Sequence, residues 1–320
     1  MEPLTLLLVY FLACTTCMVT IGYRLLCLNK KGLAWTMSVL GILLVYRFFL
    51  GEHPILRMLS LIATTFTAMK IVVTMKSYEG KPFPLSFAQW AAFAMGWAGM
   101  RAQPFETLGS RALPDAWPKI RFGLTSLTAG FAMLFLAHQV AAFDFNSDLH
   151  FLVVTALLLI AFSLILHFGL LSIAGGWWRL LGVRTYLLFK EPLKSSSLNE
   201  FWSQRWNLAF IEMTSLLIFR PFRKRGNKTT ALMLAFAFSG LLHELAISVP
   251  VNGGYGLPLL YFIIQGAAIK LEQAPLVRNS GLLENKLLAR LWVLGWLTAP
   301  IPLLFHGRFI REIIWPLAGF

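Results

Sequence analysis

Eight apolar runs, each close to the length that crosses a bilayer, constrain this 320-residue chain more than any other feature. A helix needs roughly 20 apolar residues to cross the hydrocarbon core. The candidate spans are residues 3–23, 33–50, 55–75, 122–142, 149–174, 230–249, 257–274 and 288–306. Shorter or broken apolar pieces lie at 85–100, 177–190, 207–219 and 309–319. The sequence therefore predicts an all-α fold, a polytopic transmembrane helix bundle with about 8 spans plus partial elements.

Composition and charge agree with lipid as the solvent. Hydrophobic residues make up 58% of the chain and charged residues 13%, about half the charged fraction of an ordinary soluble domain. The net charge of +14 comes from cations in short loops between apolar runs, where orientation in the bilayer explains them, so nucleic acid is not an expected partner. Cys14, Cys17 and Cys27 lie in or beside the first run without a second ligand pair, and we predict no metal site.

Loop charges set the expected orientation. With the N-terminus outside, the inside loops are 24–32, 76–121, 175–229 and 275–290, which hold most of the Lys and Arg. The opposite loops carry Asp144 and Asp148 and no cation, so the positive-inside rule favours this arrangement. The first apolar run has its cations after it, which is the pattern of a spanning helix rather than a signal peptide. We expect a multi-pass integral membrane protein, in the endoplasmic reticulum of a eukaryote or the inner or plasma membrane of a bacterium.

Two inside loops are too long and too aromatic to be plain connectors. Residues 82–121 and 175–206 alternate short apolar pieces with Pro, Trp and Arg. Trp beside Arg suits the headgroup level, so both are expected to form interfacial or re-entrant helices. Irregular backbone at membrane depth is tolerated where it is buried in protein or lines a water-filled space. We therefore expect one integral-membrane domain, residues 1–320, that encloses an intramembrane reaction chamber.

Ionisable residues inside a span are costly and indicate function. The segment FSGLLHELAISV, residues 238–249, places His243 and Glu244 among apolar neighbours, with Ser239 one helical turn before His243. The plainer interpretation is a hydrogen-bonded core histidine that joins two helices. His138 and His167, which have no comparable polar surroundings in the sequence, are expected to belong to that plainer class.

The segment FWSQRWN, residues 201–207, crowds polar and aromatic residues at a predicted membrane edge. An interfacial aromatic belt with a snorkelling arginine explains Trp202, Arg205 and Trp206. It does not explain Asn207, whose amide enters an apolar run and needs hydrogen-bond partners there.

A basic cluster follows this segment and precedes the next predicted span. Its cations are Arg220, Arg223, Lys224 and Arg225. The plainer interpretation is a positive-inside loop. The functional interpretation is a cytosolic binding site for a polyanionic cosubstrate.

FWSQRWN followed by SGLLHEL resembles the wax synthase branch of the membrane-bound O-acyltransferase family, whose members carry a box close to F-W-G-R-R-W-N and a downstream S-G-x-x-H-E-x. Ser203 and Gln204 depart from that box. The similarity covers about 201–249, which we take as the wax synthase-like core.

The resemblance implies an acyltransferase that joins the acyl group of acyl-CoA to the hydroxyl of a lipophilic alcohol, most typically a long-chain fatty alcohol, to give a wax-type ester. His243 and Asn207 are the implied catalytic pair. The implied substrate-binding residues are Trp202, Arg205, Trp206, Ser239 and Glu244. The implied candidates for the CoA phosphates are Arg220, Arg223, Lys224 and Arg225. Acyl-CoA is a cosubstrate, no cofactor is implied, membrane lipid is the surroundings, and no oligomeric state follows.

Three alternatives stay open. The acceptor is a sterol or terpenoid alcohol, which needs the same catalytic pair. Ser239 forms an acyl-enzyme, which predicts ping-pong kinetics. The protein is a proton-coupled carrier that uses His243 and Glu244 as a relay, or a non-catalytic membrane protein. Ester formation by the purified protein separates the enzyme from the last two classes.

Overall fold

Helices are the dominant structure of the described chain. The computed structural model describes residues 4–143 and 147–320, is 77% helical and contains no strand within those residues. Asp144, named above in an outside loop, lies outside the described residues. The longer α-helices are α1 (Leu4–Cys27), α2 (Lys31–Phe49), α3 (Pro54–Ser77), α4 (Phe87–Gly96), α5 (Ala116–Ala141), α6 (Ser147–Ser163), α7 (Leu171–Leu180), α9 (Leu208–Thr214), α11 (Lys228–His243), α13 (Leu257–Glu272) and α15 (Lys286–Thr298).

Shorter helices and irregular helical turns complete the chain. The short α-helices are α8 (Leu198–Glu200), α10 (Arg220–Arg225), α12 (Val249–Val251), α14 (Pro275–Arg278), α16 (Ile301–Leu304), α17 (Gly307–Phe309) and α18 (Trp315–Leu317). Two 3₁₀ turns cover Gln103–Thr107 and Pro192–Lys194. Five π-helical segments cover Leu164–Leu170, Phe201–Arg205, Ser215–Phe219, Glu244–Ser248 and Ile310–Ile314.

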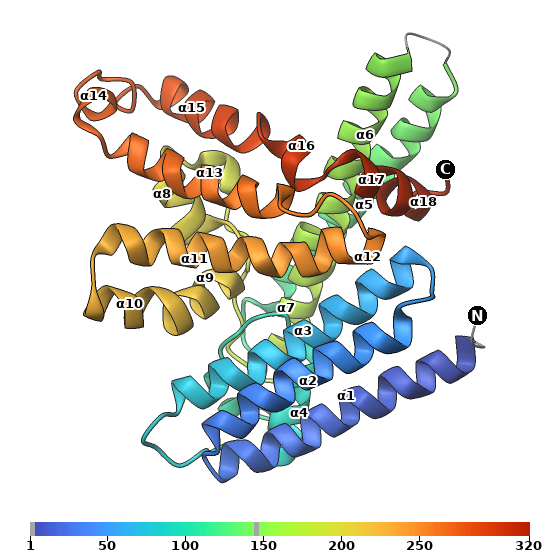
Figure 1. Ribbon diagram of the computed structural model, residues 1–320, viewed down its shortest axis with the longest axis vertical. Coiled ribbons are helices and arrows are strands. Elements are labelled where there is room, and N and C mark those ends of the chain that lie inside the picture. The colour runs from blue at the N-terminus through green and yellow to red at the C-terminus, as the bar shows by residue number, and fades with distance from the viewer. Residues whose placement is uncertain (1–3, 144–146) are drawn as a thin grey trace.

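Seven of the eight predicted spans coincide with helices that are long and apolar enough to cross a membrane. They are Leu4–Cys27, Lys31–Phe49, Pro54–Ser77, Ala116–Ala141, Ser147–Leu180, Lys228–Val251 and Lys286–Leu304. The protein is thus a multi-pass integral membrane protein with an all-α bundle, as predicted. The expected eighth span, 257–274, is the helix α13 of 16 residues. At 1.5 Å per residue it is about 24 Å long, shorter than the roughly 30 Å of a hydrocarbon core, yet it carries the chain from the side of α12 to the side of α14 (Figure 1).

The helix α3 is the interior element of the bundle. Its apolar window is 78% buried, whereas the windows of the other six spans are 17–33% buried. Lys70, in the middle of α3, is only 3% exposed. Its ammonium donates hydrogen bonds to the carbonyls of Phe93 (2.8 Å) and Ala94 (2.9 Å), and also to that of Trp97, at the end of α4. Because the last carbonyls of a helix lack partners within it, this lysine fixes α4 against α3.

The two long loops are less helical than expected. Residues 82–121 contain α4, with Ser86 and Gln89 forming a capping box at its start, and one 3₁₀ turn. Within 177–190 the helix ends at Leu180, and a non-helical stretch follows. That stretch is buried, since Val183 is 0% and Phe189 4% exposed, so its backbone packs inside the bundle.

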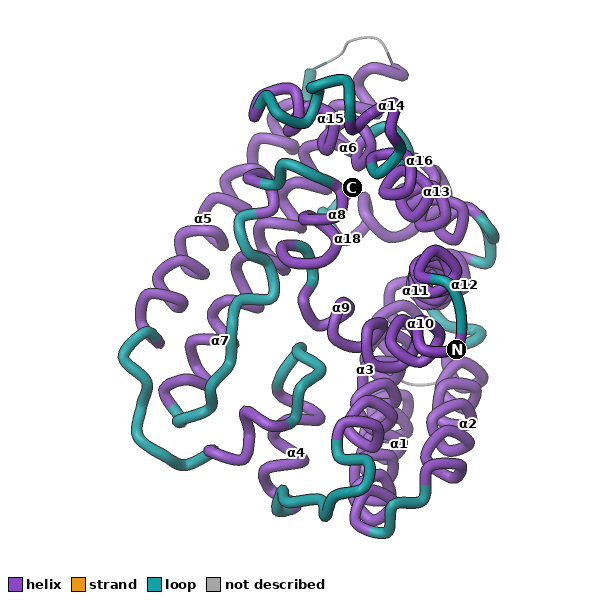
Figure 2. Tube along the Cα trace, turned by 90° about the vertical axis from the view of Figure 1, so that its left-hand side faces the viewer, coloured by secondary structure: helices purple, strands orange, loops and turns teal. Residues whose placement is uncertain are grey.

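The arrangement of the loops agrees with the predicted sidedness. In Figure 1 the turn after α3, helix α10 and helix α14 lie on the left, and the start of α1, helix α12 and the C-terminus lie on the right. Figure 2, which faces the left side, shows α9 near the middle, with α5 and α7 on one flank and α3 and α11 on the other. The loops expected in the cytosol thus share one side of the bundle, and α9 lies near its axis.

Cysteine labelling tests the orientation. We expect single cysteines at Leu276, in α14 and 82% exposed, and at Tyr255, 59% exposed, to be labelled from opposite sides of sealed vesicles, with Leu276 on the cytosolic side. The background lacks Cys14, Cys17 and Cys27, and a variant without any cysteine is the control. Labelling of both positions from one side contradicts the orientation.

Candidate functional site

The start of the FWSQRWN segment, residues 201–207, is anchored by a buried carboxylate. Glu272 of α13 is 6% exposed and accepts hydrogen bonds from the backbone N–H groups of Leu198 (2.8 Å) and Asn199 (3.2 Å). These N–H groups belong to the first turn of α8 and have no partner within that helix. The helix α8 leads directly into the segment. Glu272 therefore determines where the segment begins.

Trp202 is anchored by the same helix. Its indole N–H donates to the side-chain oxygen of Gln265 at 3.1 Å, and the fully buried Gln265 donates in turn to the carbonyl of Trp296 at 2.7 Å. The Trp202 ring also contacts Phe236 and Phe262, with centroid distances of 5.8 and 5.7 Å. Trp202 is thus fixed inside a cluster that reaches α11 and α13.

Trp206 belongs to a second aromatic cluster. It stacks on Phe201 with a centroid distance of 5.4 Å and contacts Phe189 edge-on at 4.8 Å. Its third ring neighbour is His167, at 5.5 Å. The second tryptophan therefore joins this segment to the span Ser147–Leu180.

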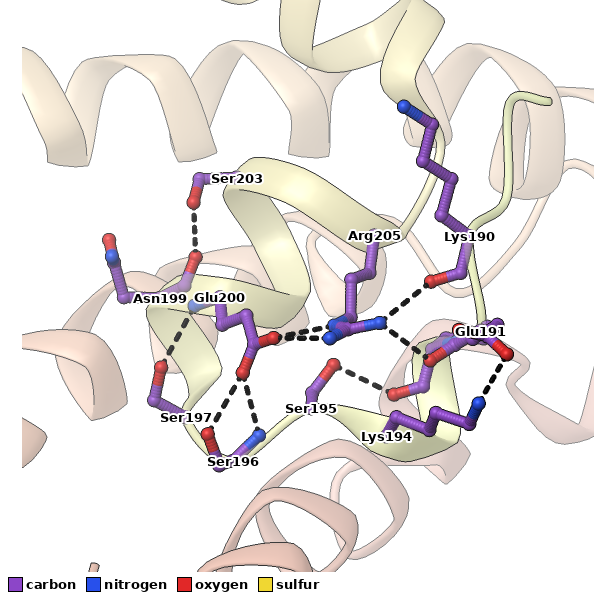
Figure 3. Close-up of polar contacts among 11 residues, drawn as sticks. Lys190, Glu191, Lys194, Ser195, Ser196, Ser197, Asn199, Glu200, Ser203 and Arg205 are labelled. Atoms are coloured by element: carbon purple, nitrogen blue, oxygen red, sulfur yellow. Dashed lines mark hydrogen bonds and ion pairs between the residues drawn. The ribbon is translucent and has the colours of Figure 1, made fainter. Parts of the chain in front are cut away.

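Arg205 has partners within the protein (Figure 3). Its Nε and Nη2 atoms both lie 2.6 Å from the Glu200 carboxylate, and Nη1 lies 3.3 Å from the carbonyls of Lys190 and Glu191. The backbone N–H of Ser196, and then Arg205, hold the pKa of Glu200 below its ordinary value of 4.5. Arg205 thus ties the segment to its own approach loop, and its contact with CoA stays a prediction.

Asn207 ends this segment in a left-handed backbone conformation, with φ 48° and ψ 67°. Asparagine is one of the few residues other than glycine that visit this region. Its side-chain oxygen accepts from the backbone N–H of Phe210 at 3.3 Å and caps α9. Within residues 4–143 and 147–320 its Nδ2 group has no protein partner. The side chain therefore has one fixed atom and one free donor.

His243 ends α11 and is half-buried. Its Nδ1 lies 2.7 Å from the carbonyl oxygen of Ser239, one turn earlier. Because a carbonyl only accepts, Nδ1 carries the proton, and the lone pair of the neutral ring lies on Nε2. The ring faces Phe262 and Phe210, with centroid distances of 4.3 and 5.4 Å. The hydrogen bond of Nδ1 thus stays within α11, and the ring packs against α9 and α13.

Asn207 and His243 are brought together by α9. The backbone N–H of Phe210 bonds Asn207, and the ring of Phe210 contacts His243. A free amide donor and a free imidazole lone pair thus flank one phenylalanine. This pair can polarise a carbonyl and accept a proton.

The remaining predicted residues of α11 have internal roles. The Ser239 hydroxyl donates to the carbonyl of Ala235 at 3.0 Å. One oxygen of Glu244 accepts from the backbone N–H groups of Gly256 and Leu259, each at 3.0 Å, and so fixes the start of α13. The other oxygen of Glu244 is buried without a partner among the described residues.

The predicted phosphate-binding cations differ from the other arginines near the site. Arg220, Arg223, Lys224 and Arg225 form α10, are exposed, and take part in no ion pair with the described residues. By contrast, Arg179 is paired with Asp115 at 2.5 Å and Arg101 with Glu212 at 2.9 Å. The four cations of α10 thus carry positive charge that no carboxylate among the described residues pairs with.

Glu212 of α9 escaped the sequence analysis. It accepts a hydrogen bond of 2.5 Å from the Tyr186 hydroxyl and pairs with Arg101. Burial raises the pKa of this carboxyl despite both partners. An acidic residue inside the apolar run 207–219 was the available signal, as were Gln265 and Glu272 in the run 257–274.

A surface groove lies elsewhere. It has a volume of about 340 Å³ and is lined by Thr20, Tyr23, Arg24 and Phe87, between α1 and α4. None of the predicted site residues lines it.

The fold is that of a polytopic membrane protein, and the helices α9 and α11 hold an asparagine and a histidine on either side of Phe210. Residues 186–264 match the sequence model of the Membrane bound O-acyl transferase family. Over this segment the chain is similar to that family and to its wax synthase-like members. The match encloses the core 201–249 that the motifs indicated.

Two relatives illustrate the similarity. The chain is 30% identical to the long-chain-alcohol O-fatty-acyltransferase of Simmondsia chinensis over 142 residues, 42% of this chain and 39% of that protein. It is 28% identical to the probable long-chain-alcohol O-fatty-acyltransferase 1 of Arabidopsis thaliana over 207 residues, 61% of this chain and 59% of that protein. The matched part thus spans roughly two-fifths to three-fifths of the relatives' lengths.

Charge-removing variants test whether Arg205 braces the segment. We expect Arg205→Ala and Glu200→Gln each to lower stability by about 1–3 kcal/mol, because each leaves a partly buried charged partner unpaired. The double variant is expected to be little worse than either single one, because both remove one interaction. Thermal unfolding of the purified protein measures the three losses.

The control is Glu191→Gln, whose exposed pair with Lys194 is expected to contribute little. Additive losses, or a lower KM for acyl-CoA in Glu200→Gln, contradict the bracing role and indicate that Arg205 is available to bind phosphate.

Proposed function

We propose that the protein transfers the acyl group of acyl-CoA to the hydroxyl of a lipophilic alcohol and releases an ester and CoA. A long-chain alcohol is the acceptor we favour, because it appears in the names of the relatives. The observation that carries the proposal is the imidazole of His243, whose Nδ1 is held by the Ser239 carbonyl so that Nε2 keeps its lone pair, with Asn207 linked to it through Phe210. We place the protein in the endoplasmic reticulum of a eukaryotic cell or the plasma membrane of a bacterium.

His243 is the general base. The Ser239 carbonyl holds the proton on Nδ1, so Nε2 accepts the proton of the alcohol as its oxygen attacks the thioester carbonyl carbon. The C–S bond then breaks, and the same proton passes from the imidazolium to the departing CoA sulfur. The proton is therefore both taken and returned within one turnover, and the atoms balance without a further acid.

Asn207 stabilises the negative charge that develops on the carbonyl oxygen. Its Oδ1 is engaged by the N–H of Phe210, which leaves Nδ2 as a fixed neutral donor. A donor that is already oriented needs no reorganisation during the reaction. Direct transfer is favoured over an acyl-enzyme, because the Ser239 hydroxyl donates within its own helix.

The cations of α10 bind the CoA phosphates. They are exposed, unpaired and on the side of the bundle assigned to the cytosol, where acyl-CoA is delivered. The pantetheine arm of CoA then reaches from these cations to the thioester beside His243, and the acyl chain continues from there between the apolar helices.

Substitution of His243 tests the base. We expect His243→Ala to lower kcat for ester formation from acyl-CoA and a long-chain alcohol by roughly 10²–10⁴-fold, the range for a lost acid–base group. Ser239→Ala is the matched control, because direct transfer needs the Ser239 carbonyl and not its hydroxyl. Near-normal turnover by a folded His243→Ala protein, or a covalent acyl adduct on Ser239, contradicts the mechanism.

Two variants of Asn207 separate its donor from its backbone role. Asn207→Asp keeps the capping oxygen, and Asn207→Gly keeps the left-handed conformation, whereas both lose the N–H donor. We therefore expect both to lose about 10²–10³-fold in kcat while remaining folded. If the aspartate or the glycine variant retains turnover, Asn207 has only a structural role.

Neutralisation of α10 tests the CoA contacts. Exposed ion pairs contribute about 0–1 kcal/mol each, so Arg220, Arg223, Lys224 and Arg225 are replaced together by Gln. We expect a higher KM for acyl-CoA with a weaker salt dependence, and little change in KM for the alcohol, which has no phosphate. Orientation is verified first, because these charges also favour the inside. An unchanged KM and salt response in a correctly inserted variant leave them as a topology signal.

A further inference from the structure

His167 lies beside the FWSQRWN segment, in contact with Trp206. It sits in the π-helical segment Leu164–Leu170 of the span Ser147–Leu180. Its ring contacts Phe189 at 4.6 Å and Trp206 at 5.5 Å. The sequence predicts a structural role for His167, because no comparable polar residues surround it there, and its contact with Trp206 arises only in the folded chain.

Two independent connections place His167 close to Asn207. Trp206, which His167 contacts, directly precedes Asn207 in the chain. The second connection runs through Phe189, which His167 also contacts. The carbonyl of Leu188, next to Phe189, accepts a hydrogen bond of 2.9 Å from the N–H of Leu208, next to Asn207. Asn207 therefore lies between Trp206, which contacts His167, and Phe210, which contacts His243.

The two histidines also lie at similar depths. Each is roughly 20 Å along its helix from the end assigned to the cytosol, Leu180 for one and Lys228 for the other. Both adjoin π-helical segments, which occur frequently at functional sites because they re-aim side chains. His138 offers a contrast: its Nε2 lies 2.8 Å from the carbonyl of Ala318, so that ring is used internally.

The hydrogen bonds of the two rings differ in a way that matters chemically. His243 has a backbone carbonyl on Nδ1, which makes Nε2 an acceptor. His167 has the Ser163 hydroxyl on Nδ1 at 3.2 Å, and a hydroxyl is able to donate to that nitrogen. With Ser163 as donor, the ring proton lies on Nε2, which has no protein partner within residues 4–143 and 147–320. His167 then presents a neutral N–H.

We propose that the Nε2–H of His167 is a second hydrogen-bond donor to the thioester carbonyl oxygen, opposite the Nδ2 donor of Asn207. This inference rests on the proposed function. It divides the chemistry between two histidines, since His243 accepts the alcohol proton and His167 donates to the oxygen that becomes negative. Two donors converging on that oxygen form an oxyanion hole around Asn207.

Two substitutions of His167 distinguish a donor from an aromatic support. His167→Phe keeps a ring against Phe189 and Trp206 and removes the N–H, whereas His167→Gln keeps an amide donor and removes the ring. We expect kcat to fall about 10²–10³-fold in the Phe variant and less than about tenfold in the Gln variant. We also expect KM for acyl-CoA to change less than about threefold in both, because the interaction strengthens only in the transition state.

The matched control is His138→Phe, which changes a histidine in another span and is expected to keep kcat. Thermal unfolding confirms that each variant is folded. Retained kcat in a folded His167→Phe protein, or equal losses in the Phe and Gln variants, overturns the assignment. If the parent protein forms no ester, the proposed function fails. If the parent protein forms ester, His243→Ala does not, and His167→Phe turns over normally, only the role of His167 is removed.

Discussion

Hydrogen bonding of the non-helical backbone governs this structure. Within lipid, each N–H and C=O that leaves a helix needs a partner in the protein. The stretch between α7 and α9 meets this requirement through α13, whose Glu272 accepts two N–H groups, and through pairing with itself. The N–H of Lys190 donates to the carbonyl of Arg205 at 2.8 Å, and the N–H of Leu208 donates to that of Leu188 at 2.9 Å. These bonds determine where Asn207 lies.

The same requirement explains why several buried polar side chains hold other groups of the site in place. Gln265, Glu272 and Glu212 contribute buried polar groups whose roles are to hold tryptophan, backbone and tyrosine in place. His243, by contrast, uses one nitrogen for the helix and keeps the other free. A site of this kind combines well-satisfied support with a few unsatisfied atoms, and those atoms are where a substrate finds its partners.

The positively charged side chains fall into two groups, those paired with carboxylates and those without such partners. Arg179 and Arg205 are mostly buried and pair with carboxylates, because an isolated cation there is costly. Arg101 is exposed and pairs with the largely buried Glu212. The cations of α10 are exposed and lack such partners within the described chain. An apolar interior with paired charges suits an acyl chain, and an unpaired basic helix at the cytosolic side suits phosphates. The proposed transfer uses both the apolar interior and the basic helix α10 at the cytosolic side of the bundle.

The sequence by itself determined the helix class, seven spans, the loop sidedness that the structure agrees with, and the family resemblance carried by two local motifs. It did so because spans of roughly 20 apolar residues and short boxes are properties of continuous segments. Tertiary structure alone decided that 257–274 forms a short supporting helix, that Arg205 pairs with Glu200, and that His167 contacts Trp206. Such contacts depend on which helix faces join after folding, and a single sequence carries no periodicity or spacing that specifies a partner many residues away.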